Sequence, residues 1–205
     1  MELFRPTGLN ELGLVLQRDL AGWPPRLPEQ PIFYPVLNRA YATQIARDWN
    51  TKSDARAGYV TQFEIDDAYA SRFERRVVGG RQHEELWVPA EELDDFNRHI
   101  HAPIRVVAAF FGADFRGILP TTGALHGKGA REQLPLLAGQ CRASLPDLQR
   151  EVTTNREAVF LHFPFWQQLD PESLELAAPK AEVLAAVRRI WESTFPTLPL
   201  PETAD

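Results

Sequence analysis

The sequence of 205 residues contains a single cysteine, Cys141, and no apolar run long enough to cross a bilayer. One thiol excludes a disulfide within the chain and a metal cluster built from cysteines, and we interpret Cys141 as a small buried hydrophobe. Nothing near Met1 combines the basic start and the apolar run of a signal peptide. We therefore expect a cytoplasmic protein, unless it is exported by a route that needs no signal peptide, and we expect no membrane partner.

The chain also lacks an excess of positive charge. It has 22 basic and 28 acidic residues, which leaves a formal net charge of −6. This balance gives no global attraction to nucleic acid or to an anionic membrane, although it is compatible with a local basic groove. Because 44% of the residues are hydrophobic and 24% are charged, the composition is that of a globular protein of one or two domains with a proper core.

The motifs of several enzyme classes are absent. There is no G-x-S-x-G, no P-loop and no G-x-G-x-x-G, which excludes the usual hydrolase, nucleoside-triphosphatase and Rossmann interpretations. His83 and Glu84 begin like an H-E-x-x-H zinc motif, but Trp87 occupies the place of the second histidine, so we expect no metal site. His99 and His101 lie around the end of a predicted helix, where a histidine caps or neutralises the terminus. His126 and His162 have no ligand-spaced companions, and we interpret all four histidines as structural.

Residues 79–97 combine the features of a site. A glycine pair and a polar run lead into a short apolar strand, and Pro89 ends this strand and begins a helix with an acidic first turn. Because side chains alternate along a strand, we expect Leu86 and Val88 to face the core and Glu85 to face the opposite side. Glu85 is then the freer carboxylate at the mouth of the strand.

Hydrophobic spacing predicts the other elements of the first half of the chain. The helix that Asn38 caps carries Tyr41, Ile45 and Trp49 at four-residue spacing, and we expect this stripe to lie in the core. Strands are predicted at residues 2–6, 32–36, 58–65 and 104–110, and helices after Thr7, at 38–49, at 66–73 and from Ala90.

The segment from Trp23 to Pro31 contains four prolines. Proline lacks an amide donor and pushes the preceding residue toward extended backbone, so a helix or a central strand is excluded here. We expect a stiff, extended loop. It is either a wall over a pocket or a rigid surface connector.

Residues 113–130 contain four glycines and little apolar periodicity, which predicts a flexible connection. Beyond it the pattern is helical, most clearly at residues 181–195, while the apolar segment 159–166 is compatible with a helix end or a buried strand. We therefore divide the chain into an α+β part, residues 1–112, and a connection with a helical region, residues 113–205.

Three residue types of possible chemical use fall on three of the predicted strands. Arg5 ends the first strand, Tyr34 lies on the second, and Glu85 opens the fourth, with His83 two residues before it. This order resembles the ADP-ribosyltransferase superfamily, in which an Arg or His, then a Ser or Tyr, then a strand-opening Glu follow one another. The resemblance covers roughly residues 1–112 and implies an α+β fold: a split core of two small sheets around an NAD cleft, here with a helical C-terminal extension.

The resemblance implies a role for each of these residues, with NAD as a substrate. Glu85 and His83 would be catalytic: the glutamate would stabilise the oxocarbenium-like charge that develops when nicotinamide leaves ribose, and the histidine would orient it or act as a base toward the acceptor. Arg5 and Tyr34 would bind NAD, the first through oxygens of its pyrophosphate or ribose and the second by stacking on nicotinamide.

Two departures from the superfamily pattern leave the acceptor open. His83 stands where many members have Gln or Glu, and no Ser-Thr-Ser follows the second strand. The acceptor is then a protein side chain, a nucleic acid, a small molecule or water, the last giving NAD hydrolysis.

Each residue also has a structural interpretation, Arg5 in an ion pair, Tyr34 in the core and Glu85 beside a helix dipole. The alternative function is a catalytically inactive protein-binding module, immunity or antitoxin-like.

Overall fold

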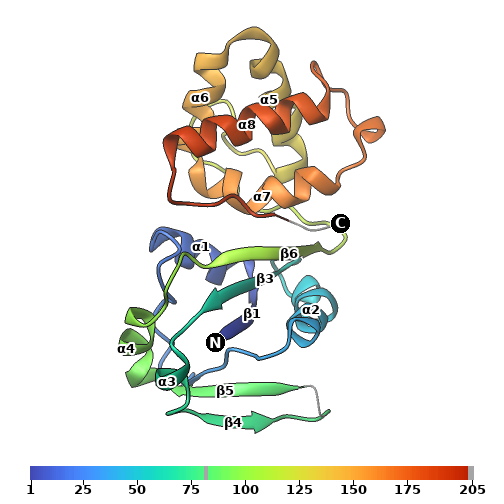
Figure 1. The fold of residues 1–205 in the computed structure, drawn as a ribbon. Helices are drawn as coiled ribbons and strands as arrows, with labels where there is room; N and C mark the ends of the chain where they lie inside the picture. The colour runs from blue at the N-terminus through green and yellow to red at the C-terminus, as the bar shows by residue number, and fades with distance from the viewer. Residues whose placement is uncertain (81–82, 203–205) are drawn as a thin grey trace.

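The computed structural model describes residues 1–80 and 83–202, and within them the chain forms two three-stranded antiparallel sheets and eight α-helices (Figure 1). The predicted α+β class and the two small sheets are confirmed. The first part contains β1 (Glu2–Gly8), α1 (Leu9–Gln17), β2 (Ile32–Phe33), α2 (Arg39–Asp48), β3 (Ala57–Glu64), α3 (Asp67–Ala70), β4 (Glu74–Val77), β5 (Glu84–Pro89), α4 (Leu93–Arg98) and β6 (Arg105–Phe111). The second part contains α5 (Ala130–Ala143), α6 (Leu145–Thr154), α7 (Arg156–Gln168) and α8 (Lys180–Thr194).

The segment after β2 joins the two sheets. One sheet has the order β1-β3-β6 and the other β2-β5-β4. Val36 pairs with Phe4 of β1 through two backbone hydrogen bonds of 2.7 and 2.9 Å, and it also forms a bridge to Glu85 of β5. Backbone groups on both sides of Val36 are thereby satisfied, as a buried chain requires. This connection brings the strand of Arg5, the segment of Tyr34 and the strand of Glu85 next to one another.

Most of the predicted elements of the first part are confirmed, but β2 ends at Phe33, so Tyr34 lies just beyond this strand and not on it. Alternation holds along β5, where Leu86 and Val88 are fully buried. Asn38 caps α2 as expected, since its Oδ1 accepts hydrogen bonds from the amides of Ala40 (2.8 Å) and Tyr41 (3.3 Å). The helix α1 begins at Leu9 with Gly8 as its N-cap, one residue later than the predicted cap.

One further expectation about the first part was wrong, and one strand was missed. Trp49 does not extend the buried stripe of α2: its exposed fraction is 57%, because the helix ends at Asp48 and the chain leaves the buried face there. The strand β4 was not predicted. All four of its residues are exposed, so no apolar alternation marks it, and it forms by pairing with β5 at the edge of the sheet. The residues Arg81 and Gln82 of the predicted polar run lie outside the described residues.

The helices α5 to α8 lie together at the β6 side of the molecule, and β4 and β5 lie at the opposite end (Figure 1). The helix α7 covers β6 and α1, and the buried hydroxyl of Tyr59 on β3 donates a hydrogen bond to the carbonyl of Leu161 on α7 (2.9 Å). Residues 159–166 are therefore part of a helix. One continuous apolar core runs through both parts of the chain and includes Leu3, Tyr59 and Trp191.

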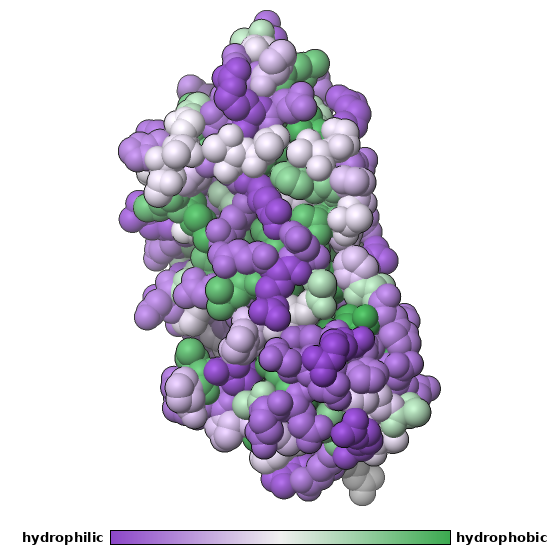
Figure 2. Space-filling view, turned by 90° about the vertical axis from the view of Figure 1, so that its left-hand side faces the viewer, coloured by the Kyte–Doolittle hydropathy of each residue, from purple (hydrophilic) through white to green (hydrophobic). Residues whose placement is uncertain are grey.

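The surface visible in Figure 2 is mostly hydrophilic. The hydrophobic residues on this face form small groups, most of them around the middle of the molecule, rather than one broad patch (Figure 2). Isolated groups of this kind are normal on protein surfaces. No helix in residues 1–80 and 83–202 is long and apolar enough to cross a membrane.

The glycine-rich segment before α5 contains no helix or strand from residue 113 to 129, but polar side chains of the helical part hold its backbone. His162 is completely buried, and its Nε2 accepts a hydrogen bond from the Ile118 amide (2.8 Å). Gln133 donates to the carbonyls of Ile118 (3.1 Å) and Lys128 (2.7 Å) and lies 2.8 Å from His162 Nδ1. His162 is thus structural, as predicted. The protonated ring nitrogen is Nδ1, because the amide needs Nε2 as an acceptor.

Burial lowers the pKa of His162 from its ordinary 6.5 to about 3. In the unfolded chain the imidazole gains a proton near its ordinary pKa, whereas in the folded chain it stays neutral, so acid favours unfolding below about pH 6.5. We expect the free energy of unfolding to fall by about 2 kcal/mol more in the wild type than in His162→Gln between pH 8 and pH 5. Urea unfolding at several pH values measures this difference. Parallel curves for the two proteins would contradict a neutral, buried His162.

Candidate functional site

Glu85 is the second residue of β5, with its side chain on the face opposite to the buried Leu86 and Val88. Its carboxylate is half-buried and accepts two hydrogen bonds, one from the Tyr41 hydroxyl to Oε1 (3.3 Å) and one from Trp87 Nε1 to Oε2 (3.1 Å). Burial, followed by the negative charge of Glu85, raises the pKa of Tyr41. The phenol therefore stays protonated and donates, so both oxygens of the carboxylate have a fixed neighbour.

Aromatic rings surround this carboxylate. The ring of Tyr34 meets the ring of Trp87 edge to face, with 5.2 Å between the centroids, and the guanidinium carbon of Arg76 lies 3.7 Å from the centroid of the same Trp87 ring. His83 stacks on Tyr41, the other donor to Glu85, with 4.1 Å between the ring centroids and 12° between the ring planes. A cation over an indole face and a histidine stacked on a phenol both favour fixed ring positions. The side chains near Glu85 are therefore mainly aromatic, together with one cation, Arg76.

His83 reaches Glu85 only through Tyr41. Its Nδ1 lies 3.3 Å from the amide of Gly80 and 3.2 Å from the carbonyl oxygen of Val78, and in the described part of the chain it makes no hydrogen bond to Glu85. His83 therefore packs on the ring of Tyr41, and the hydroxyl of Tyr41 donates to Glu85.

Arg5 extends from β1 toward α1, where its side chain is largely buried. Its Nε and Nη2 donate to Oε1 of Glu11 at 2.9 and 2.8 Å, and its Nη1 donates to the carbonyl oxygen of Tyr34 at 3.1 Å. The guanidinium carbon also lies 4.6 Å from the centroid of the Phe33 ring. Arg5 is therefore fixed by a charge-assisted pair and by the backbone of the segment that carries Tyr34.

The four residues predicted from the sequence do not converge on one place. They are linked by a chain of contacts. Tyr34 and Glu85 both contact Trp87 through their side chains, His83 joins Glu85 through a second aromatic ring, and Arg5 contacts the backbone of Tyr34. Arg5 lies on the α1 side of this segment.

Several participants were not predicted as site residues, namely Tyr41, Trp87, Arg76 and Glu11. The sequence carries a signal for Trp87, because it is two residues from Glu85 on one strand and so shares its face. Tyr41 was interpreted as part of the core, and its ring is indeed buried. Only tertiary packing shows that its hydroxyl reaches a carboxylate 44 residues away.

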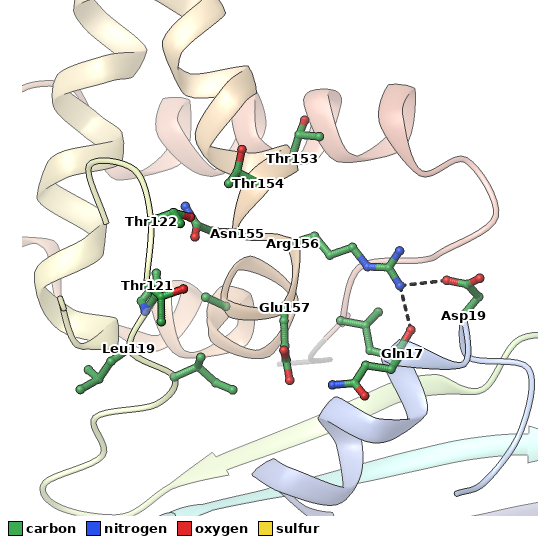
Figure 3. Close-up of a pocket in the computed structure, with 14 residues that line it drawn as sticks. Gln17, Asp19, Leu119, Thr121, Thr122, Thr153, Thr154, Asn155, Arg156 and Glu157 are labelled. Carbon is green, nitrogen blue, oxygen red and sulfur yellow. Dashed lines mark hydrogen bonds and ion pairs between the residues drawn. The ribbon is translucent and has the colours of Figure 1, made fainter. Parts of the chain in front are cut away.

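A separate hollow of about 640 Å³ lies between α1 and α7 (Figure 3). Threonines of two segments, Asn155 and Glu157 line it, and Arg156 bridges its rim to α1 by donating to the carbonyl of Leu16 and to Asp19 Oδ1, both at 2.8 Å. Neither Arg5, Tyr34 nor Glu85 lines this hollow. It is therefore distinct from the contact chain around Glu85.

Across residues 1–80 and 83–202, no group of three or more histidine, cysteine or acidic side chains is arranged to hold a metal ion. Comparisons of the chain with models of protein families, with curated proteins and with solved structures gave no match.

Proposed function

We propose that the protein transfers ADP-ribose from NAD to an acceptor, or to water, on an ADP-ribosyltransferase-like core. The observation that supports this most is the environment of Glu85: a carboxylate near the start of β5 that accepts hydrogen bonds from Tyr41 and Trp87, with the Tyr34 ring packed against Trp87. A fixed anion beside flat apolar rings suits a reaction that creates positive charge next to a leaving nicotinamide.

In this mechanism the bond between nicotinamide and ribose C1′ breaks, and its electron pair leaves with the nicotinamide. Glu85 accepts a hydrogen bond from a ribose hydroxyl and opposes the oxocarbenium-like charge on the sugar, as carboxylates do in glycoside hydrolysis. Tyr34 stacks on the nicotinamide ring, and Arg5 binds oxygens of the pyrophosphate. The acceptor then bonds to C1′ and gives up its proton, with His83 either taking this proton or positioning Glu85 through Tyr41.

The binding-module alternative predicts a cleft filled by the C-terminal helices. These helices lie on the α1 and β6 side of the molecule, whereas β5 lies at the opposite end (Figure 1). On the face of β5 that carries Glu85, the contact from a helix is the Tyr41 hydroxyl of α2. This arrangement does not match the cleft expected for the module. The enzyme additionally requires an open cleft that reaches Arg5, Tyr34 and Glu85, which NAD binding tests.

Titration with NAD, together with an assay for released nicotinamide, tests the proposal. We expect binding below millimolar NAD and release of nicotinamide that increases when a suitable acceptor is supplied. Slow release without any acceptor indicates the hydrolytic variant. If NAD does not bind at millimolar concentration, the binding module replaces the enzyme as the better interpretation.

Removing the Tyr41 hydroxyl should weaken the reaction without removing the carboxylate. Tyr41→Phe keeps the ring on which His83 stacks and deletes one of the two donors to Glu85, so we expect kcat to fall about five- to ten-fold, the equivalent of about 1 kcal/mol. Steady-state nicotinamide release measures this.

The matched control is Tyr69→Phe, which deletes a phenol bond of 2.7 Å to Asp95 away from Glu85. We expect this control to keep the wild-type kcat. An equal loss in both variants would show a general effect on the fold instead of a role of Tyr41 at Glu85.

A further inference from the structure

The proline-rich segment 23–31 is anchored at its first residue. Trp23 is completely buried, and its ring lies 5.2 Å from that of Phe33 and 5.3 Å from that of Phe63. Its backbone amide donates to Asn97 Oδ1 (2.8 Å) and its carbonyl accepts from Asn97 Nδ2 (3.0 Å). A segment fixed in this way by a buried ring and stiffened by prolines can hold a side chain in one position.

The side chain that it presents is Arg26, which joins Arg5 on the same carboxylate oxygen. Arg26 Nη1 lies 3.5 Å from Glu11 Oε1, the atom that already accepts two bonds from Arg5. The exposed fractions of the three side chains are only 10% for Arg5, 11% for Arg26 and 23% for Glu11. Two guanidinium groups therefore share one carboxylate, and one positive charge in this largely buried cluster is not balanced.

The electrostatics of Arg26 agree with this imbalance. Burial, followed by the nearby positive charge of Arg5, lowers the pKa of Arg26, and the negative charge of Glu11 only partly opposes the effect. Placing like charges together away from water is costly unless an anion compensates them.

Unsatisfied polar atoms belong to the same neighbourhood. Within the described residues, Trp23 Nε1, Arg26 Nε and Thr7 Oγ1 are buried and have no hydrogen-bond partner. The guanidinium carbon of Arg5 lies 5.7 Å from the centroid of the Trp23 ring, and Thr7 follows Arg5 on the same face of β1. A buried donor without a partner loses its hydrogen bonds to water without replacement and calls for an explanation. Unused donors beside an excess positive charge have the chemistry of a site for an oxyanion.

We infer that Arg26 and Trp23 of the proline-rich segment form, opposite Arg5, the second half of a site for the pyrophosphate of NAD. The identity of the ligand rests on the proposed function, whereas the anion site rests on the charge and the unsatisfied donors alone. A diphosphate brings several acceptor oxygens to two planar guanidinium groups, which bind such oxygens in pairs. Glu11, the most exposed member of the cluster, occupies this place without ligand and leaves the arginines when the diphosphate binds.

Calorimetric titration with inorganic pyrophosphate at low ionic strength tests the site, because this probe lacks the nicotinamide, ribose and adenine groups. We expect Arg26→Gln to raise the Kd for pyrophosphate about ten-fold, and Arg26→Lys to raise it less, because lysine keeps the charge but loses the planar fork. Arg18→Gln removes an exposed arginine at the end of α1 and should leave the Kd unchanged. Equal Kd values for the wild type and Arg26→Gln, or no binding of pyrophosphate by the wild type, would overturn the inference.

Glu11→Gln gives an independent measurement with the opposite sign. If the carboxylate competes with the ligand, its neutral amide should compete less, and the Kd for pyrophosphate should fall several-fold. A Kd that stays the same or rises contradicts displacement of Glu11. Nicotinamide release is measured in parallel: binding that depends on Arg26 without any release would keep the anion site and reject the proposed reaction. If Arg26→Gln releases nicotinamide with an unchanged kcat/KM, the proposed reaction is kept and the anion site at Arg26 is rejected.

Discussion

Replacing Glu85 with glutamine is expected to lower kcat for nicotinamide release by about a hundred-fold to a thousand-fold, which corresponds to about 3 to 4 kcal/mol. The amide has nearly the size of the carboxylate, and Glu85 is half-buried at the start of a strand, so the fold should tolerate the change. What the variant loses is negative charge. This charge opposes the cation on ribose in the transition state, where it is worth more than in bound NAD, so the loss should affect kcat more than KM.

The adjacent Glu84 provides the matched control, because side chains alternate along β5 and Glu84 points away from the face of Trp87 and Glu85. Glu84→Gln makes the same change of charge one residue away and should keep kcat within about two-fold of the wild-type value. Thermal unfolding of both variants separates loss of fold from loss of chemistry. Equal rates for the wild type and Glu85→Gln would remove Glu85 from the mechanism.

The site residues that the sequence could suggest are those whose position follows from local rules. Alternation places Glu85 opposite Leu86 and Val88, and the burial of these two residues agrees with that rule. The cluster of Arg5, Glu11 and Arg26 follows no local rule. It requires the turn from β1 into α1, which brings Glu11 to Arg5 six residues before it. It also requires the anchoring of the proline-rich segment by Trp23, which depends on the distant Asn97.

The fold shows the same division. A strand with one buried face, such as β5, carries apolar alternation and could be predicted. The central strand β3 was also predicted, although it is buried along nearly its whole length rather than on one face. The strand β4 has no buried face and exists through its pairing with β5, so its sequence Glu-Arg-Arg-Val has no signal of its own. The helix α7 is buried on nearly all sides and contains Pro164, and a uniformly apolar segment with a proline does not distinguish a helix from a strand.

The approach of α2 to β3 connects this packing to the candidate site. Gly58 on β3 lies directly against α2, and a Cβ at this position would overlap the carbonyl oxygen of Ala46 and lie 2.6 Å from its carbonyl carbon. Both atoms belong to the backbone, so no change of rotamer can relieve the overlap, and the helix must move as a unit. The same helix carries Tyr41, the donor to Glu85. A methyl group at Gly58 should therefore disturb the carboxylate indirectly.

We expect Gly58→Ala to lower the free energy of unfolding by about 3 kcal/mol, which is at the upper end for one overpacked group. For a chain of this length such a loss lowers Tm by about 6 to 12 °C. The control is Gly139→Ala inside α5, where a Cβ would meet no described atom within 4 Å, and alanine in place of glycine should stabilise the helix by about 1 kcal/mol. The midpoints of thermal and urea unfolding should thus fall for Gly58→Ala and rise for Gly139→Ala, although both substitutions add the same methyl group. In the fraction of Gly58→Ala that remains folded, kcat should also fall, because α2 has moved Tyr41 away from Glu85. A wild-type kcat in folded Gly58→Ala would separate the packing of α2 from the position of the carboxylate.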